Sequence, residues 1–175
     1  MTSNDLTILV EGDADRRFAD AIIKSRLKYK YSKITIIEYA QEQPKKISRI
    51  IQSARESNDA YIFIADLNSE KCIGIRKNKL EKKYKHLEKD KIIIVIREIE
   101  GWYLAGLIDE DMKKFGIKIY KTTNEIIKEE FEKNIPKKFT SKRDYLIEIL
   151  KKYSMPQAAK RNSSFKYFLK KYKIT

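Results

Sequence analysis

The sequence predicts an α/β protein with a mostly parallel sheet of about four strands, flanked by helices and followed by a basic helical C-terminal part. Three hydrophobic segments without polar alternation, at residues 6–10, 60–66 and 91–96, are typical of strands buried on both faces of a sheet. Segments with helical spacing of apolar residues lie between the strands. This alternation predicts βαβ units with right-handed crossovers.

The first half of the chain carries a local signal for each further element. Pro44 suits the first turn of a helix, and the segment KITIIEY is rich in residues that favour strands. The elements expected beside the three strands are a helix over about 14–29, a strand at 33–39, a helix over 44–57 and a polar helix over about 76–89.

The alternation of strands and helices ends after Glu98. Pro136 and Pro156 punctuate the remaining sequence, and Thr140 or Ser141 can cap a helix. The elements expected here are a short helix at 100–106, an edge strand at 117–120, and helices at about 123–133, 141–153 and 156–172. We therefore expect an α/β core over residues 1–110 and a basic helical extension over 111–175, packed together as one compact domain.

The positive charge of the chain indicates a polyanionic partner, most simply nucleic acid. The 175 residues carry a net charge of +14, and residues 133–175 alone contain 13 Lys or Arg and two acids, mixed with aromatic residues. A general lysine-rich composition is the alternative explanation. DNA is the more natural partner than RNA, and the candidate nucleic-acid-binding residues are Lys137, Lys138, Lys142, Arg143, Lys160, Arg161 and Lys166.

Cysteine and histidine are too scarce for several classes of site. A single cysteine, Cys72, excludes an intramolecular disulfide and a CxxC zinc site, and a single histidine, His86, excludes a histidine-rich metal site. The sequence shows neither a signal peptide nor an apolar segment of membrane-spanning length. We expect a cytoplasmic protein without a membrane partner, and its oligomeric state is open.

Three of the predicted strands end in acidic residues. Glu11, Asp66 and Glu98 each follow a hydrophobic strand, and ligands of open α/β sheets bind outside the carboxyl ends of the strands. Clustered carboxylates at that edge are a natural site for Mg²⁺ or Mn²⁺. Such ions between carboxylates and phosphate oxygens indicate phosphodiester chemistry.

Neighbouring residues extend each acidic segment. Gly12 permits a tight turn after Glu11, while Asp13 and Asp15 are explained by the start of a helix. Asp66 and Asn68, two residues apart on an extended segment, would face the same cation. Glu98 or Glu100 is either a further ligand or an acid that begins a helix.

These segments together resemble a Toprim domain, a Rossmann-like α/β fold. The residues that carry the resemblance are Glu11-Gly12 with Asp15, the Asp-x-Asp-like Asp66 to Asn68, and Glu98 to Trp102. The sequence is most similar to small stand-alone Toprim proteins of the OLD (overcoming lysogenization defect) nuclease type. Their C-terminal pattern is matched by Tyr153, Pro156, Ala158, Ala159, Ser164, Phe165, Phe168 and Leu169.

The resemblance implies metal-dependent nicking or cutting of nucleic acid. Glu11 would be a metal ligand or general base, and Lys160 would be a catalytic lysine. The implied metal ligands are Glu11, Asp15, Asp66, Asn68, Glu98 and Glu100. Asn68 departs from the pattern, which has a second aspartate there, so we expect weaker metal binding. OLD-like proteins carry or pair with an ATPase, and because this sequence has no P-loop the ATPase would be a separate subunit.

Two other functions fit parts of the sequence. A non-catalytic Toprim module that binds nucleic acid or a partner protein would tolerate Asn68. A receiver-like protein phosphorylated on Asp66 would also have acids after its first and third strands. It should, however, have Thr or Ser after the fourth strand, where this chain has Arg97-Glu98.

Overall fold

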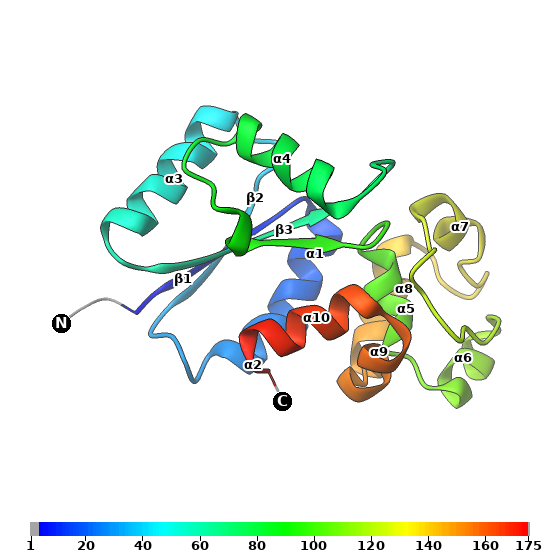
Figure 1. Ribbon diagram of the computed structural model, residues 1–175. Coiled ribbons are helices and arrows are strands. Elements are labelled where there is room, and N and C mark those ends of the chain that lie inside the picture. Colours follow the sequence, from blue (N-terminus) through cyan, green and yellow to red (C-terminus); the bar gives the residue numbers. More distant parts are fainter. Residues whose placement is uncertain (1–3, 175) are drawn as a thin grey trace. The chain divides into compact units, whose positions relative to one another are not determined.

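The computed structural model describes residues 4–174 and contains a four-stranded sheet (Figure 1). Its strands are β1 (Leu6–Val10), β2 (Ile34–Glu38), β3 (Ala60–Asp66) and β4 (Ile92–Val95), in the order β2-β1-β3-β4. β1 pairs in parallel with both β2 and β3. The predicted α/β fold with a parallel sheet of four strands is therefore confirmed.

The chain divides into two compact units, residues 1–94 and 95–175, which are described separately below. The division comes before the expected one at residue 110. The helix α5 (Glu100–Ala105) contacts α8 (Lys142–Lys151) and α9 (Met155–Arg161), so it belongs with the C-terminal helices. The expected packing of the C-terminal part on the α/β core stays a prediction.

Helices cover both faces of the sheet in the first unit (Figure 1). The helical segments are α1 (Asp13–Phe18), a π-helical stretch η1 (Ala19–Lys24), α2 (Ser25–Leu27), α3 (Pro44–Glu56), α4 (Ile73–Lys83) and a 3-10 turn η2 (Lys89–Lys91). Residues 13–27 thus form the helix expected at 14–29. α4 begins and ends earlier than the expected 76–89. On one face, α3 and α4 pack over Leu9 and Phe63, and Tyr39 stacks on Phe63 with 4.4 Å between ring centroids.

The strand order places a topological switch point between β1 and β3. The chain passes from β1 outward to β2, and then returns across β1 to form β3 and β4 on its other side. Crossover connections therefore leave the carboxyl ends of β1 and β3 in opposite directions, and ligands of such sheets bind beside this point. The residues at these two ends are Glu11 and Asp66.

The second unit is helical. It contains α5, α6 (Asp109–Phe115), α7 (Lys128–Lys133), α8, α9 and α10 (Ser163–Tyr172). The prediction of an edge strand at 117–120 is wrong, because this segment pairs with no strand. The single helix expected at 156–172 is divided at Asn162, whose backbone is extended and whose side chain caps α10 by accepting a hydrogen bond from the Phe165 amide. α6 was not expected, and only 128–133 of the helix expected at 123–133 is helical.

Trp102 forms the centre of the second unit. It is fully buried, and its ring lies 5.1 Å from Phe165 and 5.6 Å from Phe168 between centroids. The Ser164 hydroxyl accepts hydrogen bonds from the Trp102 indole at 2.8 Å and from the backbone amide of Ile96 at 3.1 Å. The motifs around Trp102 and Phe165 are therefore two halves of one core.

The presence of glycine at position 101, in the same motif, has a steric explanation. A Cβ atom there would lie 2.8 Å from the backbone oxygen of Thr123, closer than real Cβ contacts allow. A glycine therefore lets the segment before α7 pass close to α5. None of the described helices is long and apolar enough to cross a bilayer.

Replacing Ser164 with alanine should destabilise the protein. Its hydroxyl also donates to Asn162 Oδ1 at 2.8 Å, so the substitution leaves buried polar groups without their partner. We expect a loss of about 1–3 kcal/mol in the free energy of unfolding, measured by chemical denaturation. Ser163→Ala, at the exposed neighbouring position, should cost less than about 0.5 kcal/mol. Equal losses for the two variants would contradict this role of Ser164.

Candidate functional site

Glu11 follows β1 and lies beside a phenol and a guanidinium. The Tyr39 hydroxyl donates to Glu11 Oε2 at 3.4 Å, and Arg76 Nη2 lies 3.8 Å from the same oxygen. The Glu11 side chain is 33% exposed, so its carboxylate remains accessible to water or a ligand. Glu11 therefore combines a fixed position with access to solvent.

Arg76 also reaches the end of β3. Its Nε donates to the backbone oxygen of Asp66 at 2.8 Å, and the Asp66 residue is only 8% exposed. One arginine of α4 thus connects the carboxyl ends of the two strands at the switch point. Arg76 was not predicted from the sequence as part of this site. The sequence feature that could have indicated it is that Arg76 is the single arginine of the lysine-rich helix α4.

Asp15 has the structural role that its position in the first turn of α1 predicts. Its Oδ2 accepts a hydrogen bond from the backbone amide of Gly12 at 3.3 Å, and the residue is 7% exposed. Asp13 instead forms an ion pair with Arg17 at 3.0 Å. The expected need for a glycine in a tight turn at residue 12 is wrong, because Gly12 is extended with φ −153°.

Three carboxylates lie near enough to Tyr39 to act on the charge of its hydroxyl. Burial raises the pKa of its hydroxyl well above the usual value, and the negative charges of Glu11, Asp15 and Asp66 raise it further. The phenol therefore stays protonated and can only donate to Glu11 at neutral pH. We call Glu11, Asp15 and Asp66 the carboxylate cluster.

The carboxylate cluster matches Mg²⁺ or Mn²⁺ in its chemistry, because its side chains offer oxygen ligands alone. Within residues 4–174, however, no three acidic, histidine or cysteine side chains converge closely enough to surround an ion. In this conformation Arg76 supplies a positive charge beside Glu11. Ion binding at the cluster would therefore require rearrangement of the Glu11 and Arg76 side chains.

Asn68 lies in a turn and not on an extended segment. Its φ of +53° is left-handed, a conformation that asparagine and aspartate adopt more readily than most residues. The expected geometry, with Asp66 and Asn68 on one face of a strand, is therefore wrong. Asn68 as a metal ligand stays a prediction.

Glu98 and Glu100 belong to the second unit, and each has a partner there. Glu98 accepts a hydrogen bond from the backbone amide of Lys128 at the start of α7. Burial raises the pKa of Glu98, and this hydrogen bond partly offsets the rise. Glu100 is 3% exposed and forms an ion pair with Lys142 at 2.7 Å. As metal ligands both stay predictions.

Two of the candidate nucleic-acid-binding residues are engaged in ion pairs inside the second unit. Burial lowers the pKa of Lys142, but Glu100 and Glu132 outweigh this effect and raise it overall. Arg161 is 6% exposed, pairs with Asp109 and donates to the backbone oxygen of Leu107. Arg161 is thus held within the fold, because its guanidinium connects α9 to α6.

The other basic candidates lie at the surface. They are Lys137, Lys138, Arg143, Lys160 and Lys166. Lys138 packs its amine over the Phe115 ring at 5.0 Å, whereas Lys160 and Lys166 line one polar pocket with Thr122, Asn124 and Ser163. Sequence composition could not find these three polar residues, because two of them are distant from the lysines along the chain.

The receiver-like alternative lacks a structural requirement. A receiver needs a further strand whose end carries a lysine, but within the described residues β4 is followed only by helices and irregular segments. The chain therefore offers no strand end for such a lysine.

Comparison with solved structures returned C-terminal regions of OLD proteins. Two structures from Xanthomonas campestris pv. campestris have 17% and 16% sequence identity and TM-scores of 0.44 and 0.42. The match covers 97% and 85% of this chain, and 91% and 79% of theirs. One from Burkholderia pseudomallei has 14% identity and a TM-score of 0.40, over 94% of this chain and 91% of the other. No protein-family model and no curated protein matches the sequence.

The chain is thus similar to OLD C-terminal regions, as its motifs predict. The identities are low, and the likeness does not by itself assign chemistry.

Arg76→Gln should make the protein less stable without metal and more responsive to it. Loss of the guanidinium removes a charge beside Glu11 and a charged hydrogen bond to Asp66, at a cost of about 1–3 kcal/mol. Mn²⁺ should then raise the melting temperature of Arg76→Gln more than that of the unmodified protein. Arg16→Gln is the matched control, because Arg16 also donates to a backbone oxygen and lies 3.7 Å from a carboxylate, that of Glu38. An equal response of both variants to Mn²⁺ would contradict a site at the cluster.

Proposed function

We propose that this protein cleaves phosphodiester bonds of nucleic acid with Mg²⁺ or Mn²⁺ held by Glu11, Asp15 and Asp66. The observation that carries this proposal is the position of Glu11 and Asp66 at the carboxyl ends of β1 and β3, where the strand order reverses. The net charge of +14 supports a polyanionic substrate. DNA is the expected substrate, with a separate ATPase as a possible partner.

The residues of the cluster have different tasks in this proposal. A bound divalent ion would activate a water molecule and neutralise charge on the phosphate. Glu11, the more exposed carboxylate, meets the water, and the protonated Tyr39 hydroxyl orients it. Asp15 and Asp66 are nearly buried and hold fixed positions. Arg76, once it separates from Glu11, stabilises negative charge on the phosphate.

Lys160, Glu98 and Glu100 extend the proposal to the second unit. Lys160 is exposed and remains the candidate catalytic lysine. Glu98 is the more available of the two acids, because Glu100 is buried against Lys142. These three residues are secondary to Glu11 in the proposed chemistry.

Glu11→Gln should reduce cleavage of supercoiled plasmid and of single strands by at least about 100-fold, since the amide can neither accept a proton nor offer a charged ligand. Glu38→Gln is the matched control. Glu38 also ends a strand, is 27% exposed against 33% for Glu11, and also lies near an arginine. The control should cleave normally. Absence of cleavage by the unmodified protein with either ion would contradict the proposal.

A non-catalytic nucleic-acid-binding module is the second candidate. It is favoured by the lack of three converging ligand side chains within residues 4–174 and by the contact between Arg76 and Glu11. Such a protein would bind nucleic acid with a steep dependence on salt and without cleavage.

Asn68→Asp separates a weak enzyme from a pure binding module. Aspartate tolerates the left-handed conformation of residue 68, so the fold should be retained. In a metal-dependent enzyme the added charge should tighten Mn²⁺ binding, measured by calorimetry, and increase cleavage. In a pure binding module neither quantity should change.

A further inference from the structure

A pocket in the second unit has the lining expected of a site for an unpaired nucleobase. Its volume is about 510 Å³. We infer that this pocket binds one base of a single-stranded nucleic acid, so that the protein binds its substrate at a single-stranded region. The inference rests on the proposed function for its substrate class and adds a binding site and a preference for single strands.

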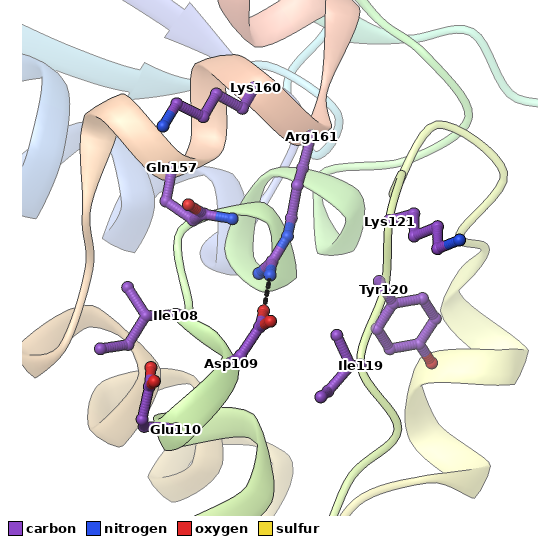
Figure 2. Close-up of a pocket in the computed structure, with 9 residues that line it drawn as sticks. All are labelled: Ile108, Asp109, Glu110, Ile119, Tyr120, Lys121, Gln157, Lys160 and Arg161. Carbon is purple, nitrogen blue, oxygen red and sulfur yellow. Dashed lines mark hydrogen bonds and ion pairs between the residues drawn. The ribbon is translucent and has the colours of Figure 1, made fainter.

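The pocket is lined by two isoleucines, Ile108 and Ile119, and otherwise by polar or charged side chains, with Asp109 and Glu110 among them. Figure 2 shows Ile108 and Ile119 on either side of the ion pair between Asp109 and Arg161. The two isoleucines are 39% and 43% exposed, although most large apolar side chains of the described chain are buried. A planar base between them would cover apolar surface on both of its faces, which favours binding of an unstacked base.

The floor of the pocket offers fixed polar groups. Arg161 is 6% exposed and bound to Leu107 and Asp109, so it cannot move far. When the Gln157 amide oxygen faces Arg161, it accepts hydrogen bonds at 2.9 and 3.0 Å, and the amide nitrogen is then a donor for a ligand. The Asp109 side chain is half exposed and is an acceptor. The edge of a base requires both donors and acceptors.

The adjoining polar pocket suits the phosphate of the same nucleotide. Lys160 and Arg161 line both pockets, and the polar one adds Lys166, Ser163 and Asn124. Two exposed lysines with a hydroxyl and an amide match a phosphodiester group, whose oxygens only accept hydrogen bonds. Single-strand binding sites combine basic groups for the backbone with side-chain surfaces, usually aromatic, on which bases stack; here the two isoleucines would take the place of the aromatic surfaces. A base within a duplex is stacked and paired and could not enter between them.

The test measures binding by fluorescence anisotropy with a short labelled single strand of mixed sequence, in EDTA so that no cleavage occurs. Ile108→Ala should weaken binding about three- to tenfold, because one of the two isoleucine surfaces is lost. Ile127→Ala is the matched control. Ile127 is also 39% exposed, also precedes a helix as its N-cap residue, and lies outside the pocket. It should bind like the unmodified protein, and Ile108→Ala should leave weak duplex binding unchanged.

Three results would overturn the inference. In the first, Ile108→Ala and Ile127→Ala weaken binding of the single strand equally. In the second, Ile108→Ala weakens single-strand and duplex binding equally. In the third, free nucleoside monophosphates compete with the strand at the same nucleotide concentration. The last result would assign the pocket to a free nucleotide. Binding is measured in EDTA, where the proposed cleavage does not occur, so failure of the proposed cleavage and failure of this site are distinguishable.

Discussion

The accumulation of negative charge around Tyr39 is the constraint on which the first unit depends. Burial raises the pKa of this phenol, and Glu11, Asp15 and Asp66 raise it further, because neighbouring negative charges disfavour its ionised form. Here the backbone amide of Gly12 offsets Asp15, and Arg76 offsets Glu11. Asp15 also caps the start of α1, whereas Glu11 and Asp66 stand at the ends of β1 and β3, where the proposed cation would bind.

The second unit uses its charges in two ways. Lys142 and Arg161 neutralise Glu100 and Asp109 and hold helices together, so they are unavailable as free phosphate contacts. Lys160 and Lys166 remain at the surface beside polar side chains. The basic residues of this unit therefore include both internal ion pairs and exposed lysines. Composition alone cannot separate them, because both roles use the same residue types.

The sheet was predictable from sequence because its strands are continuous apolar segments bounded by polar residues. Asp15 was also predictable as a helix-start acid, since this effect is local. Arg76 was not predictable, because its contact with Glu11 joins residues far apart in the sequence. Nor were the break at Asn162 and the left-handed turn at Asn68, where a side-chain hydrogen bond or a backbone preference overrides the pattern of apolar residues. The segment at 117–120 alternates like a strand but has no strand to pair with.

We expect a divalent cation to bind at the carboxylate cluster and Arg76 to withdraw from Glu11 when it does. An anomalous difference map from a crystal soaked in Mn²⁺ tests it most directly. The account predicts a manganese peak about 2.0–2.3 Å from oxygens of Glu11 and Asp66, with the Arg76 guanidinium displaced from Glu11. A map with no peak at these residues, and with Arg76 still in contact with Glu11 at saturating Mn²⁺, would contradict it.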